Sequence, residues 1–270
     1  MDDQWSMFLY AGIKNARYQL GDAIAAYAAG TLDKPHDPHA LAVLYRHMGV
    51  CRLLTTGVAE PLFIAQMQSV SAYLHRLPML PEDDKVTSRG GVFWDAIGGE
   101  YWDAAAEIVR HSRASVNPTW EHEDDFLYVW FLMTRYFPED ERQRAAPYQQ
   151  ALLDRWTTVL MGGYDPRHSL CDALLHRDSR RFCAVFDEVA DFRETRLRHL
   201  LDKGQLPKET TVWSLPIWPE GLALLRLAER DGLETDEHCK GVPQVIRAAN
   251  PYRYDGEAWR QIDVKVVFRG

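Results

Sequence analysis

The stretch from residue 5 to residue 27, WSMFLYAGIKNARYQLGDAIAAY, decides the character of the fold. Its apolar residues recur at steps of three and four, which places them on one stripe of a helix. Lys14, Arg17 and Asp22 lie on the other faces, and Gly30 follows as the residue type that commonly ends helices. The segment therefore predicts an amphipathic helix whose apolar stripe packs against other elements.

The same period continues along most of the chain and predicts a mainly α fold, either a multi-helix bundle or stacked helical hairpins. Asp37 and Pro38 supply a cap and a first helical residue for the second helix, which we expect to reach about Thr55. In a later helix the inward stripe runs from Phe182 to Phe192. The expected helices after the second one cover residues 61–74, 93–97, 101–111, 117–137, 145–161, 169–176, 179–201 and 219–230.

Residues 78–91 interrupt the helical period. They contain two prolines, an acidic run and the sequence Arg89-Gly90-Gly91, which are typical of a loop. We therefore expect one helical domain over residues 1–270, with a long surface loop at 78–91. A sub-domain break at this loop is the alternative.

The C-terminal residues change period. Ile262, Val264, Val266 and Phe268 alternate with other residues, a pattern typical of a half-buried strand. A single strand needs a partner for its backbone, and the region of Thr210 is the partner we expect. The sequence thus predicts a minor β element near the C-terminus.

Composition limits the classes of function. Of the 270 residues, 46% are hydrophobic and 26% are charged, as in ordinary globular proteins. The net charge of −8 argues against nucleic acid as a direct ligand, because phosphate binding needs a basic footprint. No apolar run is long enough for a membrane span, and the N-terminus lacks the pattern of a secretory signal. We expect no membrane partner and a location in the bacterial cytoplasm.

The chain shows no assembled catalytic motif. It lacks the nucleophile elbow, the phosphate-binding loop, the dinucleotide fingerprint and the zinc-protease helix, so we expect neither an enzyme nor a cofactor. His168, His176 and Asp178 place titratable groups near one another and are the alternative basis for a hydrolase. The pair His238 and Cys239 has no second pair at zinc-finger spacing, so it predicts no metal site.

Acidic runs are the most suggestive remaining feature. They fall at expected loops or helix ends, where carboxylates are exposed or complement a helix dipole. A surface of this kind attracts a basic partner and speeds its association. Aromatic side chains beside it are expected anchors. The candidate partner-binding residues are Glu82, Asp83, Asp84, Trp120, Glu121, Glu123, Asp124 and Asp125.

Two segments carry a resemblance to a known family. They are residues 170–182, LCDALLHRDSRRF, in which an Arg-Asp pair joins two helices, and residues 222–233, LALLRLAERDGL, followed by Val242-Pro243. Here the chain resembles the mainly helical immunity proteins of bacterial polymorphic toxin systems, either immunity protein 49 or a neighbouring helical family. The resemblance implies an antitoxin that binds a cognate toxin and occludes its active site. It implies no catalytic residues.

Three functions follow as hypotheses. The first is an immunity protein whose partner is a basic toxin, for example a nuclease with a basic substrate channel. The second is a hydrolase with an unfamiliar site, and the third is a helical-repeat scaffold that binds proteins. The sequence does not determine the oligomeric state.

Overall fold

The computed structural model describes residues 3–29, 39–206 and 213–269, and its regular elements within these ranges are helical. The mainly α fold is therefore confirmed. Short connecting turns are α7 (Glu141–Arg144), α13 (Gln244–Arg247), η1 (Leu77–Met79), η2 (Glu82–Asp84) and η3 (Ala258–Arg260). The longer helices are α1 (Asp3–Ala29), α2 (His39–Thr56), α3 (Glu60–Arg76), α4 (Gly91–Gly98), α5 (Trp102–His111), α6 (Glu123–Tyr136), α8 (Ala146–Leu160), α9 (Pro166–His176), α10 (Ser179–Asp202) and α12 (Pro219–Arg230).

Helix ends follow local chemistry. Asp165 precedes α9, and its carboxylate accepts a hydrogen bond from the backbone N–H of Arg167 at 2.9 Å. Asp178 caps α10 in the same way, accepting from the N–H of Arg181 at 3.0 Å. Gly232 follows α12 with a φ of +80°, a conformation that ends helices and suits glycine.

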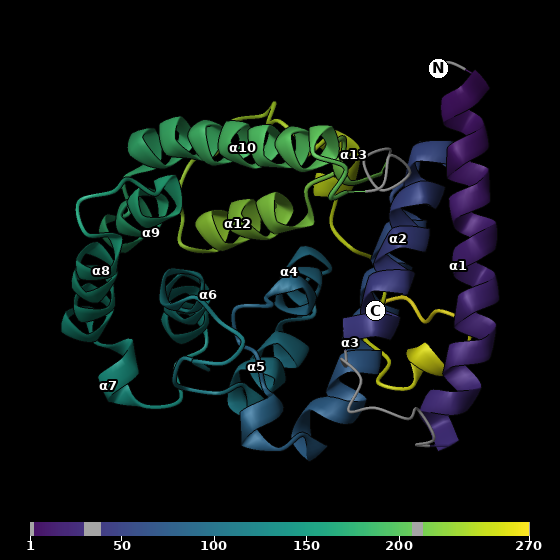
Figure 1. Cartoon of the computed structure of the whole chain (residues 1–270), viewed down its shortest axis with the longest axis horizontal. Coiled ribbons are helices and arrows are strands. Elements are labelled where there is room, and N and C mark those ends of the chain that lie inside the picture. Colours follow the sequence, from purple (N-terminus) through teal and green to yellow (C-terminus); the bar gives the residue numbers. More distant parts are fainter. Residues whose placement is uncertain (1–2, 30–38, 207–212, 270) are drawn as a thin grey trace.

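The helices enclose a central region (Figure 1). α1, α2 and α3 lie at one end of the molecule, with α2 packed against both of its neighbours, and α8 and α9 lie at the opposite end. α10 packs along α9, whereas α4 packs between α3 and α12. This arrangement brings α2, α4, α10 and the start of α12 around one region, although they are far apart in the sequence.

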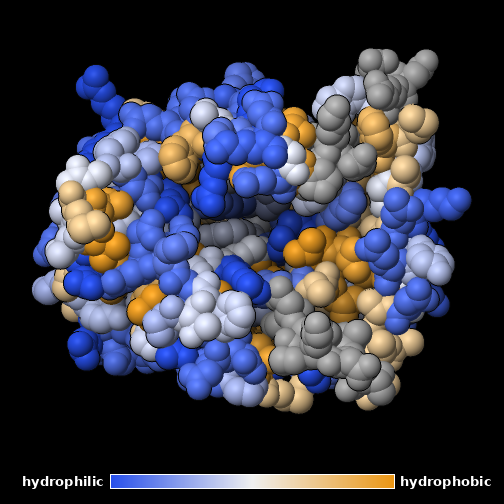
Figure 2. Space-filling view, viewed as in Figure 1, coloured by the Kyte–Doolittle hydropathy of each residue, from blue (hydrophilic) through white to orange (hydrophobic). Residues whose placement is uncertain are grey.

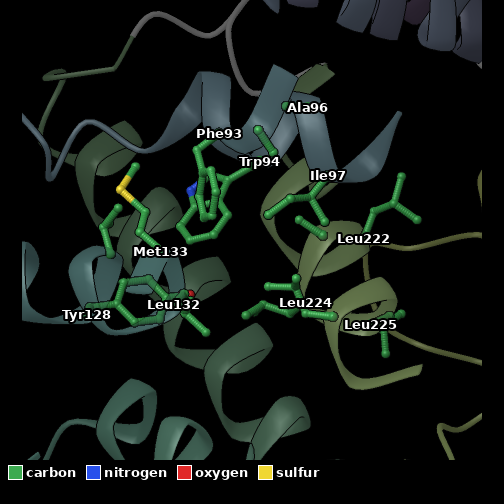
Figure 3. Close-up of a cluster of buried hydrophobic side chains, with 14 of the residues drawn as sticks. Phe93, Trp94, Ala96, Ile97, Tyr128, Leu132, Met133, Leu222, Leu224 and Leu225 are labelled. Carbon is green, nitrogen blue, oxygen red and sulfur yellow. The ribbon is translucent and has the colours of Figure 1, made fainter. Parts of the chain in front are cut away.

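The middle of the core is formed by α4, α6 and α12 (Figure 3). Phe93, Trp94 and Ile97 of α4 face Tyr128 of α6 and Leu224 of α12, and each of these side chains is at least 94% buried. Burial of each such side chain stabilises the fold by about 1.5–3 kcal/mol. The position of Trp94 is therefore set by packing from three helices.

One cluster of buried side chains crosses the 78–91 loop. It contains Val50 and Leu62 before the loop, and Ile97, Phe131 and Leu224 after it. The loop thus connects two parts of the same hydrophobic cluster.

A buried ion pair joins α2, α3 and α4. Asp95 of α4 has no exposed surface. Arg46 of α2 donates to its carboxylate through Nε at 2.9 Å and through Nη2 at 2.6 Å, and the Ser69 hydroxyl of α3 donates at 2.5 Å. The guanidinium lies over Gly91, where an added Cβ would be 2.9 Å from Nη2. These contacts fix the start of α4 against α2.

The C-terminal segment closes over the first three helices. Trp259 is fully buried in a second cluster with Leu20 and Tyr27 of α1. The Tyr45 hydroxyl donates to the Trp259 carbonyl at 2.5 Å, and the Gln68 amide donates to the Gln261 carbonyl at 2.5 Å. The last residues of the chain therefore complete the packing of its first.

The predicted C-terminal strand is wrong within the described residues. Residues 262–268 run as extended chain with a single antiparallel bridge, between Tyr252 and Phe268. Val264 and Val266 still pack partly buried against the core, which accounts for the alternating pattern. The neighbouring Pro251 has no N–H to extend the ladder. The expected partner at Thr210 lies outside the described residues, as do Gly30, Asp37 and Pro38.

The start of α6 also differs from the sequence expectation. The sequence Asn117-Pro118 resembles a cap followed by a first helical residue, but the helix begins at Glu123. Asn117 accepts backbone hydrogen bonds from Trp120 and Glu121 in a separate turn. None of the helices in the described ranges has the length and apolar character needed to cross a bilayer.

Candidate functional site

The structure brings two of the predicted acidic segments together. Arg113 pairs with Asp83 at 3.1 Å and also donates to the carbonyl of Glu82 at 3.1 Å. The Asn117 amide donates to the carbonyls of Asp83 and Lys85 at 2.9 and 3.1 Å. The loop around 82–88 and the loop around 113–121 therefore form one platform.

The Glu121 carboxylate links the two loops of this platform. Its Oε1 accepts from the backbone N–H of Ser88 at 2.5 Å, and its Oε2 accepts from the N–H of Asn117 at 2.6 Å. Both carboxylate oxygens are thus used within the chain. The adjacent Trp120 is 61% exposed on a turn that these bonds fix. Glu121 accordingly positions the platform, and Trp120 is the side chain that the platform presents.

Glu82, Asp83 and Asp84 form the exposed acidic edge of the platform, on η2. The Asp83 side chain is 96% exposed despite its contact with Arg113. Glu82 pairs with Lys85 at 2.9 Å and keeps 58% of its side chain exposed. We call Glu82, Asp83, Asp84 and Trp120 the acidic platform.

The remaining candidates, Glu123, Asp124 and Asp125, lie in the first turn of α6 and face other helices. Arg155 of α8 binds Glu123 through two bonds of 2.7 and 2.8 Å. Arg167 of α9 pairs with Asp125 at 2.7 Å and with Asp124 at 3.7 Å. These three carboxylates are partly neutralised inside the molecule, and they fasten α6 to α8 and α9.

A pocket of about 200 Å³ opens between α2, α4, α10 and α12. No pattern in the sequence indicates it. Figure 2, in the view of Figure 1, shows the surface of the molecule hollowed near its middle. Two of the pocket's tryptophans, Trp213 and Trp218, lie on either side of Pro216 before α12, and a third, Trp94, comes from α4. We call this pocket the central groove, defined by Arg46, Trp94, Arg193, Trp213, Trp218 and Glu220. Its residues come from positions 46 to 220, so no local motif predicts their meeting.

Glu220 lies at the start of α12, where a carboxylate complements the helix dipole. Its Oε1 accepts from the Tyr128 hydroxyl at 2.6 Å, and its Oε2 accepts from the Trp218 indole N–H at 3.4 Å. Burial, together with the charge of Glu220, raises the pKa of the Tyr128 hydroxyl well above its usual value. Tyr128 therefore stays a hydrogen-bond donor that fixes Glu220.

Arg193 of α10 lies on the same indole as Glu220. Its guanidinium is 5.9 Å from the centre of the Trp218 ring and donates to the backbone carbonyls of Ser214 and Ile217. Burial lowers the pKa of Arg193, and the nearby charge of Glu220 opposes that shift. Among the described residues, no ion pair joins Arg193 to a carboxylate.

A second pocket, of about 160 Å³, shares Arg193, Trp218 and Glu220 with the central groove. It continues along α10 to Phe192 and Arg196. Phe192 was expected to point inward but is 49% exposed, because α10 extends past the core beyond Ala190. Arg193, Trp218 and Glu220 thus line two neighbouring pockets.

The titratable groups considered for hydrolysis have separate partners. His168 contacts the Leu153 carbonyl at 3.1 Å and lies edge-on to Trp156. His176 contacts the Asp172 carbonyl at 2.9 Å, and Asp178 is the cap of α10. Within the described ranges, no three His, Cys, Asp or Glu side chains are grouped to hold a metal ion.

Comparison of the chain with family models, with curated proteins and with solved structures finds no match.

Proposed function

We propose that this chain is an immunity-type protein that binds a basic toxin domain in the bacterial cytoplasm and occludes its active site. The observation that supports this binding surface is the acidic platform. There, a 61% exposed tryptophan lies on a hydrogen-bonded turn beside an acidic edge. The antitoxin role rests on the resemblance to helical immunity proteins.

The platform suits fast and tight association with a basic protein. Exposed carboxylates steer a positively charged partner and raise its association rate at low salt. Trp120 supplies apolar area with little loss of backbone freedom on binding, because the Glu121 and Asn117 contacts already fix its turn. Trp120 is thus the expected anchor, and Asp83 and Asp84 are the expected steering charges.

A viability assay tests this proposal. Each secreted toxin domain encoded beside the gene for this chain is induced in a bacterial host with and without the chain. We expect one such domain to kill the host alone and to be tolerated when the chain is present. Death at equal rates for every neighbouring toxin, with the chain confirmed as soluble, contradicts the proposal.

Two variants then locate the surface. Trp120→Ala is expected to weaken binding of that toxin about 30-fold or more, as for an interface hot spot of about 2 kcal/mol. The paired change Asp83→Lys and Asp84→Lys is expected to slow association and to reduce its salt dependence. Tyr18→Ala and Asp202→Lys are the matched controls, since they change exposed residues of α1 and α10 far along the chain. Equal effects from the controls contradict the assignment of the surface.

A further inference from the structure

The central groove contains a half-buried positive charge, that of Arg193, which forms no ion pair with a carboxylate in the described part of the chain. Arg193 is held by two backbone carbonyls and by the face of Trp218, and its desolvation is not offset by an ion pair within the described residues. A desolvated guanidinium gains more from an oxyanion than from neutral carbonyl acceptors. Arg46 also lines the groove, but Asp95 already balances its charge. Arg193 is therefore the group that an incoming anion meets.

The groove also contains a negative charge without an ion pair in the described part of the chain. Glu220 is fixed by two neutral donors, the Tyr128 hydroxyl and the Trp218 indole. Each carboxylate oxygen accepts more than one hydrogen bond, so both oxygens keep acceptor capacity. Glu220 and Arg193 contact the same indole and line the same pocket, so the groove presents one negative and one positive group.

Most of the other residues that line the groove are apolar, and the groove is close in size to a single ring. Trp94, Trp213 and Trp218 line it together with Val50 and Ile217. Cavities of about 150 Å³ are known to hold a benzene ring, so a pocket of about 200 Å³ holds a ring or a branched aliphatic group with short polar ends. A nucleotide or an oligomeric ligand exceeds this space.

We propose that the central groove binds a small zwitterion with an apolar side chain, which is the chemistry of a free α-amino acid. The carboxylate pairs with Arg193, the ammonium pairs with Glu220, and the side chain lies among the tryptophans. An ammonium near indole faces gains a further cation–π contribution. The groove and the acidic platform share no residues, so this site does not depend on the proposed antitoxin function.

Calorimetric titration of the full chain with matched ligands tests the charge requirement. The probes are L-phenylalanine, L-leucine, 3-phenylpropanoate, which lacks the amine, and 2-phenylethylamine, which lacks the carboxylate. We expect L-phenylalanine or L-leucine to bind. Both single-charge analogues should bind about tenfold more weakly or worse, because each leaves one charge of the groove without an ion pair. Comparable binding of either analogue, or no binding of any probe at about 10 mM, overturns the proposal.

Two variants assign the charges to their residues. Arg193→Gln is expected to weaken amino acid binding about tenfold or more while leaving 2-phenylethylamine unchanged. Glu220→Gln keeps an acceptor for Tyr128, and it is expected to weaken amino acid binding while leaving 3-phenylpropanoate unchanged or tighter. Arg198→Gln on the same helix is the control, since Arg198 is exposed and pairs with Glu194.

Folding is checked separately from binding. Arg193→Lys keeps the charge and serves as a second variant if the glutamine variant melts early by circular dichroism. It is expected to retain more amino acid affinity than Arg193→Gln. Uniform loss of all four probes in every groove variant indicates collapse of the pocket and overturns the assignment of charges. A groove variant that no longer binds amino acids is expected to still protect cells from the toxin. The two proposals can therefore fail independently of each other.

Discussion

Asp95 is a fully buried carboxylate that links three helices. Its two oxygens take hydrogen bonds from the guanidinium of Arg46 and from the hydroxyl of Ser69, so three helices depend on it. The sequence showed an aspartate in a helical stripe, but nothing local marked it as buried. Burial of this residue is a property of the assembled helices.

Removal of Asp95 is expected to be costly. Asp95→Ala leaves the Arg46 charge buried without a partner, and we expect unfolding free energy to fall by about 3–5 kcal/mol. The control is Asp263→Ala, which removes a carboxylate that pairs with Arg17 but is 65% exposed, and it is expected to cost less than about 1 kcal/mol. Denaturant unfolding monitored by tryptophan fluorescence measures both, and equal losses contradict the argument.

His47 is expected to make the folded state less stable as the pH falls. It stacks on Trp213 at 4.8 Å, and burial lowers its pKa below its usual value. The unfolded chain therefore binds a proton at about pH 6.5 that the folded chain resists, and stability is lost as the pH falls through this window. We expect the pH slope of the unfolding free energy between about 7 and 5 to be shallower in His47→Gln than in the parent chain. His238→Gln, at an exposed position, is the control, and an unchanged slope in His47→Gln contradicts this assignment.

At the scale of elements, local patterns predicted the helices well where a stripe and an end signal agreed. The segment over 219–230 begins at a proline and stops before Gly232, and the structure has α12 over the same residues. The predicted helix start at Asn117 is wrong because the side chains of Asn117 and Glu121 bond to the backbone of residues 83–88 instead. Those bonds are long-range, so spacing along the chain does not show them.

The cap of α10 provides a prediction at this scale. Asp178→Ala removes the acceptor for the Arg181 N–H, and we expect a loss of about 1 kcal/mol in unfolding free energy. Asp178→Ser restores a capping oxygen and is expected to recover most of that loss. Thermal melts of the two variants measured side by side separate capping from loss of charge, since only the alanine variant should be impaired. Equal impairment of the serine variant contradicts the capping role.

At the scale of the whole molecule, the candidate sites differ in how far the sequence predicted them. The acidic platform contains residues that acidic runs and an exposed aromatic had marked, although the structure assigns Glu121 to an internal role. The central groove was not predicted, because Arg46, Arg193 and Glu220 come from separate helices. Only the packing of those helices makes them neighbours.

Trp259 packs the C-terminal segment of the chain against its first helix, and we expect it to stabilise α1. Trp259→Ala removes a fully buried indole that contacts Tyr27 edge-on at 5.1 Å, with an expected cost of about 3–5 kcal/mol. Amide hydrogen exchange should then accelerate most in α1, because that helix belongs to the same cluster. Trp156→Ala, in the main cluster, is the matched control without a selective effect on α1. Uniform acceleration across all helices in Trp259→Ala contradicts a local role.

The closure of the C-terminal segment over the first helices has a consequence during synthesis. The Tyr45 hydroxyl cannot form its hydrogen bond to Trp259 until the chain has grown by a further 214 residues. At about 5–20 residues per second, that interval lasts roughly 10–40 s on the ribosome. Throughout it, the faces of α1 and α2 that later receive Trp259 remain apolar and uncovered. We therefore expect chaperones that hold exposed hydrophobic helices to bind the nascent chain until translation passes residue 260.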